Sequence, residues 1–123
     1  MEIAFSAFRA VGAYRRFQPW VRALQGASGV YIIRALAGTI LYIGESHTGR
    51  LYETLTRHFQ DWNGQTAGPS YHRGRVEAAV ALVPADHAVA VRNALIAAHS
   101  PDDNRRIAPV VDIVDEGGEE VPF

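Results

Sequence analysis

The chain has 123 residues and a formal net charge of -1, with 48% hydrophobic and 20% charged residues. This composition is that of one ordinary globular domain and excludes a disordered or fibrous chain. Without cysteine, disulfide bonds and thiolate zinc sites are excluded, so any metal must be held by oxygen or imidazole. The N-terminus lacks a targeting pattern and no apolar run could span a bilayer, so we expect a cytoplasmic protein without a membrane segment.

The charges are unevenly distributed along the chain. Five acidic residues and no basic ones lie between Asp112 and Glu120, so the first 111 residues carry eight acidic residues against twelve arginines, a net charge of about +4. The chain contains no lysine. The guanidinium fork suits phosphate oxygens, although a GC-rich coding sequence would also favour arginine and the many alanines.

The first third of the chain predicts short helices and a hairpin. Residues 5–24 have apolar side chains at loosely helical spacing, interrupted by Gly12 and Pro19, which predicts two short helices. Residues 30–34 and 39–43 are rich in β-branched and aromatic residues and are separated by a tight connection. Two strands this close in sequence should form an antiparallel hairpin.

The rest of the chain predicts two helices, a strand and a long loop. Residues 50–62 have apolar side chains at intervals of three and four, typical of an amphipathic helix. A loop rich in Gly, Pro, Ser and Asn spans residues 63–74, and such loops are often functional. A third strand is predicted at 76–83 and a second long helix at 85–99, with one more short strand at 110–114.

Together these elements predict a single α/β (α+β) domain with a small, three-stranded antiparallel central sheet flanked by helices. We expect three regions along the chain: a helical N-terminal extension at about 1–27, a core at about 28–107 and an acidic tail at about 112–123. The tail is expected to fray.

Two tripeptides mark the outer ends of the predicted hairpin. Gly29-Val30-Tyr31 opens the first strand and Tyr42-Ile43-Gly44 closes the second. The eleven-residue offset between the tyrosines allows both rings to lie on one face of the hairpin. Taken without other residues, the two rings are also what a half-buried sheet would use for packing.

The two tripeptides resemble the two halves of the GIY-YIG nuclease signature, with valine in place of isoleucine, and the resemblance continues through His58 to Asn104. It implies an endonuclease that hydrolyses DNA phosphodiester bonds with Mg²⁺ or Mn²⁺. In such an enzyme a tyrosine, helped by a histidine, activates water while an arginine neutralises the phosphate. Tyr31 and Tyr42 are then the candidates for the base and for a phosphate ligand, in either order. A phenol with an ordinary pKa near 10 needs a nearby cation to act as a base.

The arginine and histidine are expected on the helix after the hairpin. The family usually carries its arginine four residues before the histidine, and that position here is Thr54. Arg50 lies one turn further back on the same flank as Thr54 and His58, so its long side chain could reach the same phosphate. Arg57 is the second candidate, about 100° around the helix from His58. As neutral imidazole, His58 can accept a proton near pH 7.

Three further residues are weaker candidates. Tyr71 and His72, in the long loop, are candidate phosphate contacts, although they also fit a role as simple loop residues. Asn104 follows Pro101 in a predicted turn, where asparagine is common even without a functional role. The resemblance implies that Asn104 fixes the backbone of the active site through its side chain.

The resemblance fails at the metal ligand, because the family's glutamate falls at position 92 and this chain has Arg92. A guanidinium cannot replace the carboxylate that Mg²⁺ prefers. Three explanations stay open: a natural variant that binds DNA without cutting, a change made to trap an inactive form, or another acid as ligand, with Glu45 and Glu77 as substitutes. We therefore expect a nuclease fold with weak or no cleavage, the alternative being a non-catalytic DNA-binding module that uses the same cleft.

Overall fold

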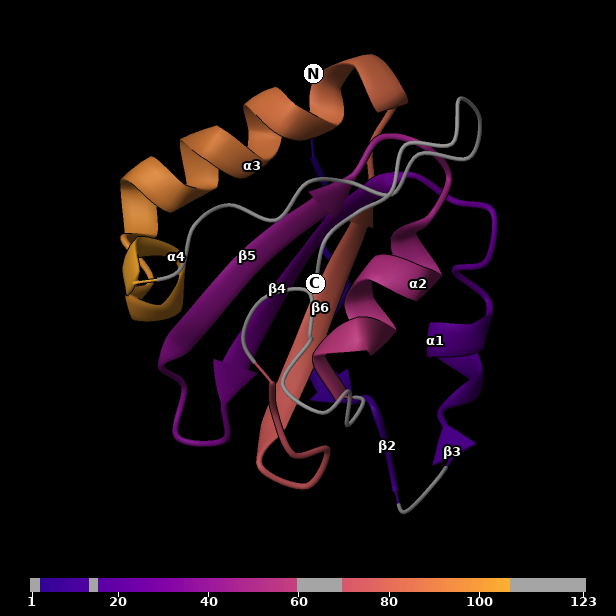
Figure 1. Cartoon of the computed structure of the whole chain (residues 1–123), viewed down its shortest axis with the longest axis vertical. Helices are drawn as coiled ribbons and strands as arrows, with labels where there is room; N and C mark the ends of the chain where they lie inside the picture. The colour runs from indigo at the N-terminus through magenta and orange to yellow at the C-terminus, as the bar shows by residue number, and fades with distance from the viewer. Residues whose placement is uncertain (1–2, 14–15, 60–69, 107–123) are drawn as a thin grey trace.

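The computed structural model describes residues 3–13, 16–59 and 70–106 (Figure 1). Its centre is an antiparallel sheet of four strands in the order β1-β6-β4-β5, beside a separate two-stranded hairpin of β2 and β3. The strands are β1 (Arg9–Ala10), β2 (Gly12–Ala13), β3 (Arg16–Phe17), β4 (Gly29–Ala35), β5 (Ile40–Ser46) and β6 (Val76–Leu82). The helices are α1 (Pro19–Arg22), α2 (Leu51–Thr56), the 3-10 turn η1 (Arg57–Phe59), α3 (Ala85–His99) and α4 (Asp102–Arg106).

The predicted hairpin is confirmed, and its register places both tyrosines on one face. Tyr31 on β4 lies opposite Gly44 on β5, and Ile33 lies opposite Tyr42. Side chains alternate between the faces of a strand, so Tyr31, its partner Gly44 and, two residues before Gly44, Tyr42 share a face. The register shifts after Ile33, within the half of the hairpin nearer its turn.

The mixed α and β class is confirmed, but the expectation of three strands is wrong, since β1 adds a fourth strand along β6. The expectation of two helices over residues 5–24 is also wrong. Of these residues, those that the structure describes form three short strands and the single turn α1. Gly12 explains the difference, because a Cβ there would collide with the Arg16 carbonyl across the tight β2–β3 pair. Pro19 begins α1, since its fixed φ suits a first helical position.

The two main helices lie where their patterns predict. Helix α2 begins at Leu51 and passes into η1 at Arg57, while the expected last turn of this helix, 60–62, lies outside the described residues. Helix α3 spans Ala85–His99 and ends at Ser100 in the left-handed conformation (φ 46°). The segment expected as a turn after Pro101 is instead the helix α4. Of the expected loop, only 70–74 is described; the predicted strand 110–114 and the acidic tail lie outside the described residues.

The sheet buries both faces. Leu51 and Leu55 of α2 pack with Tyr31 and Ile33 on one face, to which α1 also contributes. On the other face Ala88 of α3 packs with the alternate strand residues, Val30, Ile32 and Ile43. Figure 1 shows α2 in front of the sheet and α3 crossing near β5. Within the described ranges, no helix has the length and apolar character needed to cross a bilayer.

Gly44 is required by the ring that lies over it. A Cβ at Gly44 would overlap the hydroxyl end of Tyr31. We expect Gly44→Ala to displace this ring and to lower the free energy of unfolding by about 1–3 kcal/mol, the usual cost of overpacking. Urea denaturation measures this change. Gly74→Ala is the matched control, since a Cβ at Gly74 meets no atom within 4 Å; an equal loss in both variants would show that the Tyr31 contact is not the cause.

Candidate functional site

Three predicted side chains from separate elements meet on the α2 face of the sheet. The Tyr31 hydroxyl on β4 lies 2.7 Å from Nε2 of His58 in η1, within hydrogen-bond distance. The Tyr42 ring on β5 lies 4.8 Å from the His58 ring and 6.3 Å from the Tyr31 ring, between centroids. We call Tyr31, Tyr42 and His58 the tyrosine–histidine cluster. The hairpin register and the length of α2 bring these rings together.

The tyrosine–histidine cluster is closed to solvent. Tyr31 and His58 are each 1% exposed and Tyr42 is 4% exposed. Neither the hollow around α1 nor the one along β6 includes a cluster residue. In this conformation the phenols therefore offer little exposed surface to a ligand.

Burial keeps the phenols protonated. It raises the pKa of Tyr31 well above its usual value, and the neighbouring Tyr42 and the Glu45 carboxylate raise that pKa further. Burial also raises the pKa of Tyr42, while the positive charge of Arg92 opposes this effect. A general base needs the opposite shift. In this state the phenols are hydrogen-bond donors and weak acceptors, but poor bases.

Arg92 presents a cation where the resemblance implies a metal ligand. It lies on α3 and is half-buried, and its Nε donates a hydrogen bond of 2.8 Å to the Asn93 side chain. Its positive charge opposes the rise in the pKa of Tyr31 and Tyr42 that burial causes. Position 92 thus lies on the helix that packs against the face of the sheet opposite the tyrosine–histidine cluster, and it carries a positive charge.

The two substitute acids lie in different places. Glu45 is buried at 6% exposure, its Oε1 is 3.0 Å from Nδ1 of His47, and its charge acts on both phenols. By register Glu45, opposite Val30, and Glu77, opposite Arg34, both alternate to the face away from the tyrosines, and Glu77 pairs with Arg34 at 3.0 Å. Among the described residues, no group of three or more metal-ligating side chains could hold an ion.

Asn104 on α4 clamps the backbone of β5 beside the cluster. Its Oδ1 accepts a hydrogen bond of 2.8 Å from the Ile43 amide, and its Nδ2 donates one of 3.0 Å to the Ile43 carbonyl. Strand β5 is the last strand of the described sheet, so the amide of Asn104 stands in for a neighbouring strand. Asn104 thus holds the strand segment that carries Tyr42, which is a positioning role.

Tyr71 extends the cluster, whereas His72 does not join it. The Tyr71 amide donates a 2.7 Å hydrogen bond to the His58 carbonyl, and its ring lies 6.0 Å from the His58 ring. Its hydroxyl donates a 2.6 Å hydrogen bond to Asp103 on α4. Burial, and then this bond, raise the pKa of Tyr71. His72 is exposed. Sequence analysis does not single out Asp103, because only the position of α4 brings it to Tyr71.

The flank of α2 before His58 is polar and mostly paired. The Arg50 amide donates to the Ser46 hydroxyl at 3.0 Å, and the Arg50 guanidinium lies 3.5 Å from the Glu53 carboxylate. Thr54, one turn before His58, is 7% exposed, and its hydroxyl has no partner among the described residues. Arg57 is half-buried in η1. Arg50 and Arg57 both remain candidates for the phosphate contact.

Comparison of the chain with models of protein families, with curated proteins and with solved structures finds no match. The resemblance to GIY-YIG nucleases therefore rests on the residues and on their geometry.

The buried phenols predict an alkaline loss of stability. Below pH 10 the phenols are protonated in both the folded and the unfolded protein, so their ionisation does not affect the free energy of unfolding. Above about pH 10 the unfolded phenols lose protons that Tyr31, Tyr42 and Tyr71 still hold in the fold, so the free energy of unfolding falls as pH rises. Urea denaturation at increasing pH measures this fall, and phenolate absorbance should show that Tyr31, Tyr42 and Tyr71 ionise only on unfolding. Ionisation of these tyrosines near pH 10 in the folded protein would contradict the burial of the cluster.

Removal of the Asn104 clamp should destabilise the edge of the sheet. Asn104→Ala leaves the Ile43 amide and carbonyl without their side-chain partner, and we expect a loss of roughly 1–3 kcal/mol. Denaturation measures the loss, and hydrogen exchange should show faster exchange of the Ile43 amide. Gln25→Ala, at an exposed amide side chain after α1, is the control and should change stability by less than about 0.5 kcal/mol. Unchanged protection of Ile43 would refute the clamp.

Proposed function

We propose that this chain is a GIY-YIG-type domain that engages a DNA phosphate at the tyrosine–histidine cluster, and that it hydrolyses the phosphodiester weakly or not at all. The 2.7 Å hydrogen bond between Tyr31 and His58 carries the proposal. It joins a tyrosine of the first tripeptide to the histidine of the following helix, with the tyrosine of the second tripeptide 4.8 Å from that histidine. Ordinary core packing of strand aromatics does not require a histidine at this position.

The charges favour binding over cleavage. A guanidinium forms charge-assisted hydrogen bonds with phosphate oxygens, and Arg92 supplies such a group on α3, with its positive charge favouring the ionised form of both phenols. Neutral phenols add further donors, and the buried Thr54 hydroxyl on the His58 flank would be satisfied by the same ligand. None of these groups supplies a carboxylate for a divalent cation.

Hydrolysis would need a phenol with a lowered pKa, and the burial of the phenols opposes this. A phenol acts as a base only when its pKa falls toward neutrality, and burial shifts the pKa of Tyr31 in the other direction. His58 can take the Tyr31 proton through their hydrogen bond, which is the step that a nuclease with this arrangement would use. A deoxyribonuclease is therefore the alternative function. A change at position 92 distinguishes this enzyme from a domain that only binds DNA.

The test compares Arg92→Glu with Arg92→Gln. Both variants remove the guanidinium at similar side-chain size, but only the glutamate offers a metal ligand. Cleavage of single-stranded, branched and duplex DNA is measured with Mg²⁺ or Mn²⁺. We expect little cutting by the original chain and by Arg92→Gln, and an increase of at least about tenfold for Arg92→Glu, because a metal site lowers the barrier by more than 1.4 kcal/mol.

Binding of the same DNA is measured in parallel as a function of salt. The original chain should bind with an affinity that falls as salt rises, and Arg92→Gln should bind more weakly. Efficient metal-dependent cutting by the original chain would favour the enzyme. Absence of both binding and cutting in the original chain and in Arg92→Glu would reject a role on DNA.

A further inference from the structure

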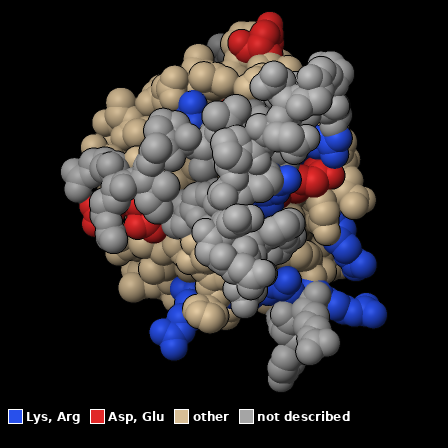
Figure 2. All heavy atoms as spheres, in the orientation of Figure 1, with Lys and Arg blue, Asp and Glu red and all other residues tan. Residues whose placement is uncertain are grey.

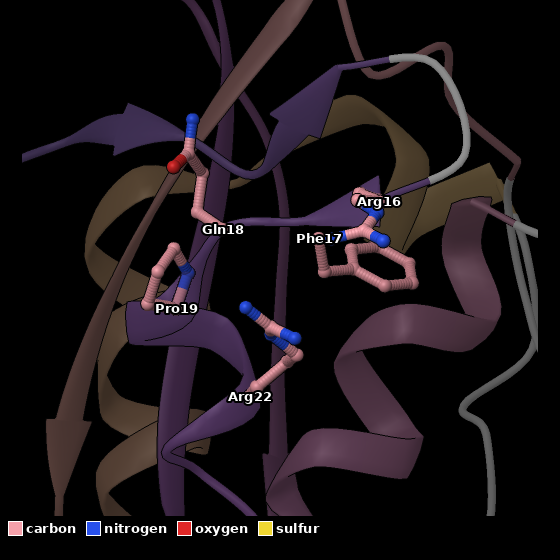
Figure 3. Close-up of a pocket in the computed structure, with 5 residues that line it drawn as sticks. All are labelled: Arg16, Phe17, Gln18, Pro19 and Arg22. Carbon is pink, nitrogen blue, oxygen red and sulfur yellow. The ribbon is translucent and has the colours of Figure 1, made fainter.

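A hollow of about 310 Å³ lies at the surface between β3 and α1, away from the tyrosine–histidine cluster (Figure 3). Arg16 from β3 and Arg22 from the end of α1 supply its charged groups, and both are exposed. In Figure 3 the Arg22 side chain rises from α1 toward the segment that carries Phe17 and Gln18. The lining contains no acidic residue: it consists of Arg16, Phe17, Gln18, Pro19 and Arg22.

The surroundings of this hollow are basic in sequence and in space. Residues 3–44 contain five arginines and no aspartate or glutamate, and of these arginines Arg34 is paired with Glu77, whereas the printed lining of the hollow holds Arg16 and Arg22 without an acid. The guanidinium of Arg73 lies over the Phe17 ring, 4.0 Å from its centroid, and adds a third cation beside the hollow. Figure 2 shows basic atoms gathered at the lower right, over the region that Figure 1 assigns to α1 and β3. A positive surface of this kind attracts polyanions.

The backbone around the hollow is held in place by the core. The Gln18 amide donates a 2.8 Å hydrogen bond to the Val11 carbonyl, which ties the end of β3 to the chain before β2. Val21 and Leu24, in and just after α1, are buried against the sheet. The two arginines therefore project from a fixed frame, which reduces the entropy lost when a ligand binds.

A row of aromatic rings connects the hollow to the cluster. The Phe17 ring lies 6.3 Å from the Phe59 ring, Phe59 lies 6.4 Å from Tyr71, and Tyr71 lies 6.0 Å from His58. The hollow and the cluster are thus on the same side of the sheet, within the reach of a strand a few nucleotides long.

We propose that the hollow between β3 and α1 binds the phosphate backbone of a nucleic-acid strand and is a second anchoring site outside the tyrosine–histidine cluster. The choice of nucleic acid rests on the proposed function. Exposed arginines are commonly only solvated, but here two of them share one concave surface that has no acidic lining. Guanidinium groups in this arrangement suit phosphate oxygens, and backbone contacts do not require a particular base sequence.

The test measures DNA affinity at several salt concentrations for Arg16→Ala, Arg22→Ala and the double variant. Each lost phosphate contact lowers the slope of log affinity against log salt by about 0.7–0.9, so the double variant should lose about 1.5 in slope. We expect its affinity at low salt to fall at least about tenfold. Arg75→Ala removes one exposed charge from the turn before β6 and is the matched control. Thermal unfolding should be unchanged, because Arg16 and Arg22 are exposed.

The outcomes separate this proposal from the proposed function. If the double variant binds DNA like the original chain while Arg92→Gln binds more weakly, the hollow is not a DNA site and the cluster proposal stands. If Arg75→Ala loses as much DNA affinity as each single variant, the loss reflects the general positive charge of the protein, and the hollow is rejected as a specific DNA site. If the original chain binds no DNA, both proposals fail.

A second measurement identifies the ligand class. The side-chain Nε–H resonances of Arg16 and Arg22 are followed during titration with a short oligonucleotide and, separately, with inorganic phosphate. We expect both resonances to shift with the oligonucleotide at concentrations at least about tenfold below those needed with phosphate, because several contacts act together. Equal affinity for inorganic phosphate would assign the hollow to a small anion and overturn a nucleic-acid site.

Discussion

The hydrogen bond between the Tyr31 hydroxyl and His58 is the constraint around which the site is organised. It connects the central strand β4 to the turn that follows α2, across the most buried part of one sheet face. Both partners are polar groups out of contact with water, so breaking the bond would leave each unsatisfied. Gly44 has no side chain because the Tyr31 ring fills the space above it.

Two residues of α4 hold the tyrosine–histidine cluster in place from the β5 edge of the sheet. Asn104 binds the backbone of Ile43, next to Tyr42, and Asp103 accepts a hydrogen bond from the Tyr71 hydroxyl. Tyr71 in turn binds the carbonyl of His58. Helix α4 therefore restrains both the strand and the turn that carry the cluster, although none of its residues belongs to the cluster itself.

The electrostatics of the cluster suit a phosphate ligand better than phosphate hydrolysis. Burial keeps the phenols neutral, and Arg92 supplies positive charge at the position where the resemblance implies a carboxylate for the metal. The basic surface at β3 and α1 has the same charge sign and lies on the same side of the sheet. A polyanionic strand is the ligand that both features would recognise.

Local patterns in the sequence are sufficient for the β4–β5 hairpin, β6, α2 and α3, because apolar periodicity and glycine positions act over a few residues. The family resemblance, and not a local pattern, selects Tyr31, Tyr42 and His58, which the structure brings together, and Asn104, which binds the Ile43 backbone. Only the tertiary structure decides that β1 extends the sheet, that Glu77 lies on the opposite face with Arg34, and that Asp103 binds Tyr71. It also decides that the phenols are closed to water, since burial depends on segments distant in sequence, which no local pattern encodes.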